Sequence, residues 1–240
     1  MNNIICVKWG DKYSREYVKK LKRQCEENCS VPFNFYCLTD NPTEDYDVPL
    51  PTYWDVHENG KFWAYKKLYM FKEIQLELTG KKFLYLDLDV IIHQDLKYFF
   101  DLPMDKPYIV RGWWNDTSTV KRNFSKHKST PLNSSVIRWD RGQLNDVWNQ
   151  INANPEVIFF TYPSLDNYLN HKWYNIWDED MGFFRGFPKG DIYSWYKGNT
   201  FPDDMEKRKI REDHKICLFN NSTFNEGIND DEIKKLWLTV

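Results

Sequence analysis

Several features of other protein classes are missing from this sequence. No stretch approaches the roughly 18 consecutive apolar residues that mark a membrane-spanning helix. The first residues also lack the charged and apolar segments of a secretory signal, so we expect no transmembrane segment and a cytoplasmic location. Lys and Arg total 33 against 35 Asp and Glu, and the net charge of −2 provides no basic field for a nucleic-acid backbone. Nucleic acid is therefore not an expected partner.

Cysteine and glycine are also scarce. The five cysteines are odd in number and lack the spacing of a zinc site, so we expect reduced thiols that are mostly buried. Gly10 is the single glycine after the first apolar run, where a nucleotidyltransferase would be expected to carry a glycine-rich phosphate loop. No internal repeat or low-complexity linker divides the 240 residues, and we expect one domain.

Aromatic residues, in contrast, are abundant. The chain has 11 Trp, 15 Tyr and 16 Phe, which together make up 18% of the residues. Such a surplus either fills a core or stacks against flat and sugar-like ligands. The sequence leaves both uses open.

The order of apolar and amphipathic segments predicts an α/β fold, with a twisted and mostly parallel sheet flanked by helices. Residues 3–7 are expected to form a strand, residues 14–28 a helix and residues 33–38 a second strand. Such a unit pairs its strands in parallel through a right-handed crossover. Residues 41–60 are expected to be mostly irregular, and residues 111–128 to form a loop that covers a ligand. Further strands are expected at 83–92, 108–110, 133–139 and 215–219, and helices at 61–78, 95–100, 142–152, 163–170 and 229–237, the last capped by Asn229 with Glu232.

The most informative stretch is residues 83–92, FLYLDLDVII, an apolar run interrupted by Asp87 and Asp89. Residues two apart share a face of an extended chain, so both carboxylates point the same way and Leu88 turns back into the core. If the strand ends near Leu86, the acids lie just past its carboxyl edge, where open α/β sheets bind ligands. Two hard oxygen ligands there suit Mg²⁺ or Mn²⁺. The alternative is that the acids are structural, as caps or ion-pair partners.

Five segments, in this order, resemble the glycosyltransferases of the GT-A fold, in particular the family-8-like group of bacteria and their viruses. They are WGDKY at 9–13, FYCLTDNP at 35–42, WAYKKLYMF at 63–71, LYLDLDVII at 84–92 and NSSVIRW at 133–139. The resemblance implies metal-dependent sugar transfer from a UDP- or GDP-linked nucleotide sugar to a carbohydrate-containing acceptor on a glycan, lipid or protein, with retention of the anomeric configuration. Residues 1–140 would bind the nucleotide sugar and the metal, and residues 141–240 would form the acceptor side.

The same resemblance implies roles for individual residues. Asp87 and Asp89 would hold Mn²⁺ or Mg²⁺ against the diphosphate, and Lys67 would be a catalytic lysine beside it. Asp166 falls where the family often carries an acid or an amide near the reacting carbon of the sugar, which makes it the second catalytic candidate. The other donor-binding residues would be Lys8, Trp9, Gly10, Thr39, Asp40, Trp63, Leu88, Asn133, Ser134 and Lys197.

One part of the family's pattern is replaced. Members commonly complete the metal shell with a histidine in a phrase such as Phe-His-Gly, whereas this chain has Phe219, Asn220 and Asn221. Asn220 would offer a neutral carbonyl oxygen as the third ligand, which a hard cation accepts. The replacement leaves open a catalytically inactive module that binds glycans or nucleotide sugars. A nucleotidyltransferase on a related fold is a further alternative.

Overall fold

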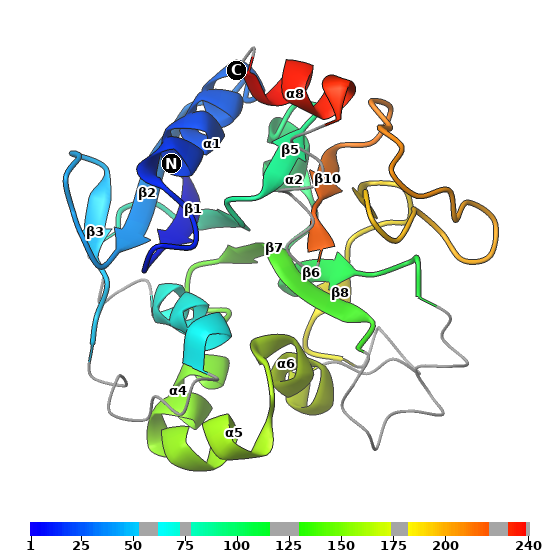
Figure 1. Cartoon of the computed structure of the whole chain (residues 1–240). Coiled ribbons are helices and arrows are strands. Elements are labelled where there is room, and N and C mark those ends of the chain that lie inside the picture. Colours follow the sequence, from blue (N-terminus) through cyan, green and yellow to red (C-terminus); the bar gives the residue numbers. More distant parts are fainter. Residues whose placement is uncertain (53–61, 73–77, 116–129, 174–181, 221–229, 239–240) are drawn as a thin grey trace.

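The computed structural model describes residues 1–240 except 53–61, 73–77, 116–129, 174–181, 221–229 and 239–240 (Figure 1). Its strands form a seven-stranded sheet in the order β3-β2-β1-β4-β7-β6-β8 and a three-stranded sheet in the order β5-β10-β9. In the larger sheet, β7 runs antiparallel to both of its neighbours, and every other adjacent pair is parallel. This is the mixed α/β architecture with a mostly parallel sheet that the sequence predicts.

The N-terminal strand–helix–strand unit builds one half of the larger sheet. β1 (Asn2–Lys8) pairs in parallel with β2 (Phe33–Thr39), and α1 (Arg15–Glu27) connects them. β4 (Lys82–Leu86) pairs in parallel with the other edge of β1. Residues 4–6 of β1 are fully buried because helices cover both faces of the sheet. The parallel crossover predicted from the sequence is confirmed.

Successive residues of β1 point into two different cores. Ile5 packs in a core with side chains from η2, α4, α5 and α6, whereas Ile4 packs in a core with side chains from α1 and α2. Figure 1 shows η2, α4, α5 and α6 on one side of the larger sheet and α1 on the other. The bounds of these elements are η2 (Phe62–Phe71), α2 (Lys97–Asp101), α4 (Asn145–Ala153), α5 (Pro155–Thr161) and α6 (Leu165–Trp173).

The acidic stretch is divided between the two sheets. β4 ends where the acids begin, and β5 (Val90–Ile92) pairs antiparallel with β10 (Ile216–Leu218) in the smaller sheet. β10 also pairs in parallel with β9 (Ile192–Ser194). The strand expected within 83–92 therefore ends at Leu86, with the acids just past its carboxyl edge, and residues 90–92 form a separate strand rather than its continuation. The chain changes sheets at the acids, and neither acid lies within a strand.

The remaining strands complete the larger sheet. They are β3 (Asp47–Pro49), β6 (Tyr108–Arg111), β7 (Leu132–Asp140) and β8 (Arg185–Gly186). Residues 41–60, expected to be mostly irregular, include the short strand β3, which pairs in parallel with β2. The Asp47 carboxylate lies 2.6 Å from the Arg15 guanidinium of α1, and this ion pair holds the short strand in place.

Two helix predictions need correction. The helix expected at 61–78 is the 3-10 helix η2, and residues 73–77 lie outside the described part of the chain. Most residues from 65 to 71 are buried, so the helix lacks the exposed basic face that the sequence pattern indicated. In α8 (Asp231–Leu238) the capping acceptor is Asp230, which receives the N–H groups of Glu232 and Ile233, while Asn229 is not among the described residues.

All five cysteines are free, and four of them are buried, as expected of reduced thiols. Among the described residues, no helix is long and apolar enough to cross a membrane.

Candidate active site

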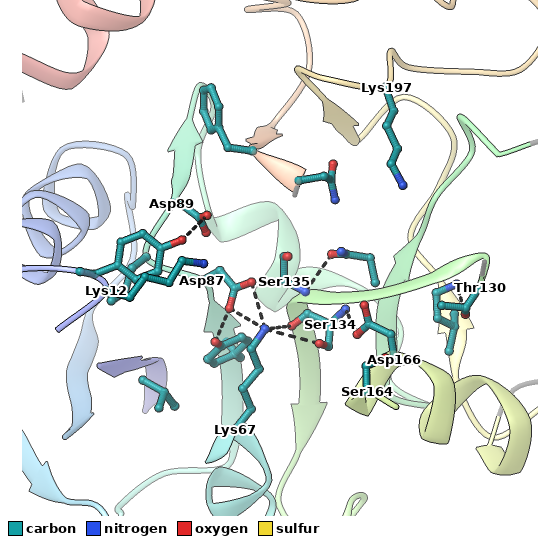
Figure 2. Close-up of a pocket in the computed structure, with 18 of the residues that line it drawn as sticks. Lys12, Lys67, Asp87, Asp89, Thr130, Ser134, Ser135, Ser164, Asp166 and Lys197 are labelled. Atoms are coloured by element: carbon teal, nitrogen blue, oxygen red, sulfur yellow. Dashed lines mark hydrogen bonds and ion pairs between the residues drawn. The ribbon is translucent and has the colours of Figure 1, made fainter. Parts of the chain in front are cut away.

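A cavity of about 540 Å³ opens where β1 and β4 end at their carboxyl edges (Figure 2). Its volume lies within the range of small-ligand sites, and its wall combines apolar, hydroxyl and charged side chains. The residues that line it come from five parts of the chain: Val7, Trp9, Lys12 and Tyr13; Lys67, Tyr85, Asp87, Leu88 and Asp89; Trp114, Asn115, Thr130 and Leu132 to Ser135; Ser164 and Asp166; and Lys197, Phe219 and Asn220.

Asp87 is held by three groups. Its backbone N–H donates to the carbonyl of Ser135 at 2.9 Å, which extends the pairing of β4 with β7 by one residue. Its carboxylate lies 2.7 Å from the Lys67 ammonium and accepts a hydrogen bond from the Tyr85 hydroxyl. The Lys67 and Asp87 side chains are only 19% and 20% exposed, so this ion pair is partly shielded from water.

Asp89 has a different environment. Its carboxylate accepts a hydrogen bond from the Tyr13 hydroxyl at 2.7 Å, and the described residues place no cation within ion-pair distance of it. Burial, followed by the negative charge of Asp87, raises the pKa of Asp89 to about 6. Burial and the charge of Asp89 in turn raise the pKa of Tyr13, which keeps that hydroxyl protonated as a donor. Because the charge of Asp87 raises the pKa of Asp89, the two carboxylates are close enough to repel each other.

These features fit a divalent cation held by few protein ligands. A cation between Asp87 and Asp89 would offset their repulsion, and Asn220 lines the same cavity. In the described part of the chain, no group of three or more His, Cys, Asp and Glu side chains is arranged to hold a metal. Mg²⁺ sites with one or two carboxylates complete their shell with water and substrate phosphates. The residues present thus suit a cation that binds together with a phosphate ligand.

Asp166 lies in the first turn of α6, across the cavity from Asp89 (Figure 2). Its carboxylate accepts the backbone N–H of Ser134 at 2.9 Å. Burial raises the pKa of Asp166, and the positive charge of Lys67 opposes that rise. The Lys67 ammonium also lies 3.4 Å from both the carbonyl and the hydroxyl oxygen of Ser134. Lys67 therefore stands between Asp87 and the Ser134–Asp166 side of the cavity.

Several predicted donor-binding residues lie beside the cavity rather than in its wall. The Lys8 ammonium donates to the carbonyl of Gly10 at 2.7 Å, and the N–H of Gly10 donates to the Asp40 carboxylate at 2.7 Å. Thr39 is buried at the end of β2. Lys8, Gly10, Thr39 and Asp40 thus lie at the adjoining ends of β1 and β2, next to Trp9, which lines the cavity. Trp63 lies in η2, but its side chain is outside the described part of the structure.

The other predicted residues line the cavity, and the structure adds some that sequence reasoning missed. Asp87, Leu88, Asp89, Asn133, Ser134, Lys67, Asp166, Lys197 and Asn220 all contribute to the wall. The additions include Tyr13 and Tyr85, which hold the two acids. Both tyrosines could have been predicted from their positions in the sequence. Tyr13 is the last residue of the WGDKY segment, and Tyr85 lies two residues before Asp87 and therefore shares a face of the strand with it. The loop expected to cover the site lies outside the described residues from 116 onward.

The fold that carries this cavity is that of the GT-A glycosyltransferases. No protein-family model and no curated protein matches the sequence. Among solved structures, the galactosyltransferase LgtC in complex with donor and acceptor sugar analogs matches with a TM-score of 0.62 at 10% identity, over 99% of this chain and 96% of that chain. A glycosyltransferase involved in glycosylation of the major capsid of PBCV-1 matches with 0.56 at 16% identity, over 98% and 99%. Mouse xyloside xylosyltransferase 1 matches with 0.52 at 9% identity, over 92% and 98%.

Proposed function

We propose that this protein is a metal-dependent glycosyltransferase. It moves a sugar from a UDP- or GDP-linked donor to a carbohydrate-containing acceptor and retains the anomeric configuration. The observation that carries the proposal is the grouping of Asp87, Asp89, Lys67 and Asp166 in one cavity, at the edge of the sheet where α/β folds bind their ligands. The likeness to GT-A glycosyltransferases supports it. The proposed metal rests on the acid pair of this chain, and the proposed retention rests on the resemblance to the family-8-like group.

The diphosphate end of the donor is assigned to the acidic side of the cavity. Asp87 and Asp89, with Asn220, would hold Mn²⁺ or Mg²⁺, which neutralises charge on the leaving diphosphate. Lys67 adds a positive charge that is already positioned by its ion pair with Asp87. The base and ribose are assigned to the adjoining strand ends, where Trp9 offers a ring for stacking. The other groups at those ends are Lys8, Gly10, Thr39 and Asp40, and Trp63 is assigned to the same donor site.

The transferred sugar is assigned to the side of the cavity that Asn133, Ser134 and Asp166 form. When the bond between the anomeric carbon and the diphosphate breaks, positive charge develops on that carbon. A carboxylate that the Ser134 N–H already orients can stabilise this charge without reorganising. Asp166 is therefore assigned the role of stabilising the positive charge on the anomeric carbon. Leu88, which is 3% exposed and lines the cavity between Asp87 and Asp89, is assigned to the same donor site.

This division of roles follows the chain. Residues 1–140 supply the acids, Lys67 and the strand ends for the nucleotide, whereas residues 141–240 supply Asp166, Lys197 and Asn220. We assign both parts to one glycosyltransferase domain with a shared cavity. The acceptor then approaches over the C-terminal part.

Calorimetry with UDP- and GDP-sugars, with and without Mn²⁺, tests the proposal, followed by assays of donor hydrolysis and transfer. We expect binding that needs Mn²⁺ and hydrolysis of at least one donor. Asp89→Asn should lose both, and Asp203→Asn, which removes an exposed acid from the same protein, should lose neither. Metal-dependent binding without any turnover would favour a catalytically inactive nucleotide-sugar-binding module. Failure of every nucleotide sugar to bind would overturn the proposal.

A further inference from the structure

Lys197 is a half-buried cation without an assigned partner. Figure 2 shows its side chain descending into the cavity from the segment after β9, toward Asp166. Within the described part of the chain, its ammonium forms no ion pair and no hydrogen bond. The other buried cation of the cavity, Lys67, is paired with Asp87. Burying an ammonium group without an anion costs free energy, and an anionic ligand in the cavity would offset that cost.

The surroundings of Lys197 place it on the sugar side of the cavity. Burial lowers the pKa of Lys197, and the acid whose charge opposes this is Asp166, not Asp87 or Asp89. Asp166 is itself engaged by the Ser134 N–H and influenced by Lys67. Lys197 is therefore separate from the acids assigned to the diphosphate.

The segment that carries Lys197 is rigidly built. The backbone N–H of Lys197 donates to the Ser194 hydroxyl at 3.0 Å, and the backbones of Ser194 and Gly198 exchange two hydrogen bonds. Gly198 has φ +97°, and a Cβ there would lie 2.9 Å from the Cα of Met205. Only glycine is accommodated at this position. The fold thus fixes the direction in which Lys197 leaves the backbone.

We propose that Lys197 forms an ion pair with an anionic group, a carboxylate or a phosphate ester, that is carried by a sugar bound in the cavity. This rests on the proposed function, because it assumes that the metal and Lys67 already neutralise the diphosphate. The anion belongs either to the transferred sugar or to the acceptor, since both meet near Asp166. The substrate class is therefore an acidic or phosphorylated saccharide rather than a neutral one.

Binding measurements on the wild type, Lys197→Met and Lys197→Arg test this inference. The Met side chain keeps the length and removes the charge, and Arg restores the charge. Lys207→Met is the matched control, because Lys207 is an exposed lysine of the same segment outside the cavity. With Mn²⁺ present, one arm compares UDP-glucose with UDP-glucuronic acid and GDP-mannose with GDP-mannuronic acid. The other arm compares the neutral methyl glucoside with two anionic saccharides, methyl glucuronide and glucose 6-phosphate. Each of these measurements is made with UDP or GDP present and again without nucleotide.

We expect the wild type to prefer the anionic probe by about tenfold in one arm, which corresponds to about 1.4 kcal/mol. Lys197→Met should remove the preference, Lys197→Arg should restore most of it, and Lys207→Met should leave it intact. A preference among the nucleotide sugars assigns the anion to the transferred sugar, and one among the free saccharides assigns it to the acceptor. UDP and GDP alone should bind equally to the wild type and Lys197→Met.

Two results would overturn the inference. One is equal binding of anionic and neutral probes to the wild type in both arms. The other is a loss of UDP or GDP affinity in Lys197→Met as large as its loss of sugar affinity, which would make Lys197 a phosphate ligand. Failure of the proposed function has a different signature, namely no binding of UDP, GDP or any nucleotide sugar to the wild type. The free-saccharide arm without nucleotide still tests Lys197 in that case.

Discussion

Replacing Asp89 by asparagine should stabilise the metal-free protein. Burial and the charge of Asp87 raise the pKa of Asp89 from 3.8 to about 6. A carboxyl group whose pKa is higher in the folded state destabilises that state once it ionises, so the cost is present at pH 7.5. The whole rise is equivalent to about 3 kcal/mol at about 1.4 kcal/mol per pKa unit. Because Asp89 is partly exposed, and the buried amide has a desolvation cost of its own, we expect a gain of about 1–2 kcal/mol.

Asp87→Asn should behave differently, although it lies only two residues away. It also relieves the repulsion, but it leaves the Lys67 ammonium without the carboxylate that lies 2.7 Å from it. A partly buried ion pair of this kind is worth about 1–2 kcal/mol, between the values for exposed and fully buried pairs. We therefore expect Asp87→Asn to be close to the wild type in stability and below Asp89→Asn.

Thermal melts at pH 7.5, with a chelator or with Mn²⁺ and a nucleoside diphosphate, measure both effects. For a chain of this length, 1 kcal/mol shifts Tm by about 2–4 °C, so Asp89→Asn should melt about 2–8 °C above the wild type in chelator. Ligand stabilisation by Mn²⁺ and diphosphate should be largely lost in both variants. Asp101→Asn, which changes an exposed acid on α2, is the control. The reasoning is refuted if both variants melt well below the wild type in chelator and keep its full response to Mn²⁺.

Three other changes probe the same structure. Tyr13→Phe removes the hydroxyl that orients Asp89 and should weaken Mn²⁺ binding by about tenfold in calorimetry, and unchanged affinity would show that this hydrogen bond does not matter. Asn220→His should tighten Mn²⁺ binding, since a neutral imidazole is a good ligand for a transition metal, and a folded variant with the same affinity would contradict a role for Asn220 as a ligand. Burial and the nearby His214 lower the pKa of His93 from 6.5 to about 4, so the unfolded state binds more protons and stability falls as the pH drops through that interval. Between pH 7 and 5 His93 should account for about 2 kcal/mol of lost stability in denaturant titrations, and a loss of the same size in His93→Gln would exclude it as the cause.

Local patterns in the sequence were sufficient to predict the N-terminal half of the fold. β1, α1 and β2 follow from one apolar run, one amphipathic segment and a second apolar run. A helix that connects two neighbouring strands of one sheet favours parallel pairing with a right-handed crossover. The place of Asp87 and Asp89 at the end of a strand follows in the same way, from the point where polar residues interrupt the run.

Features that depend on distant partners could not be predicted from local patterns. Residues 83–92 read as one strand, yet the chain leaves the larger sheet after β4 because β5 pairs with β10, more than a hundred residues later. β3 is too short and polar to read as a strand, and it depends on the ion pair between Asp47 and Arg15. Tertiary contacts override local propensity at both places.

The candidate site has the same dependence on distant partners, and Lys67 shows it best. Sequence patterns place Asp87 at a strand end, Asp166 in the first turn of a helix and Lys67 on a separate helix, but nothing in them states that one ammonium group acts on both carboxylates. In the structure, Lys67 pairs with Asp87 and opposes the rise in the pKa of Asp166, while Asp89 accepts a hydrogen bond from Tyr13 and is influenced by Lys67 and Lys12 without an ion pair to either. Three carboxylates in one cavity thus have three different electrostatic environments. Differences of this kind allow acids in one site to take separate roles, with Asp87 and Asp89 at the cation and Asp166 at the sugar.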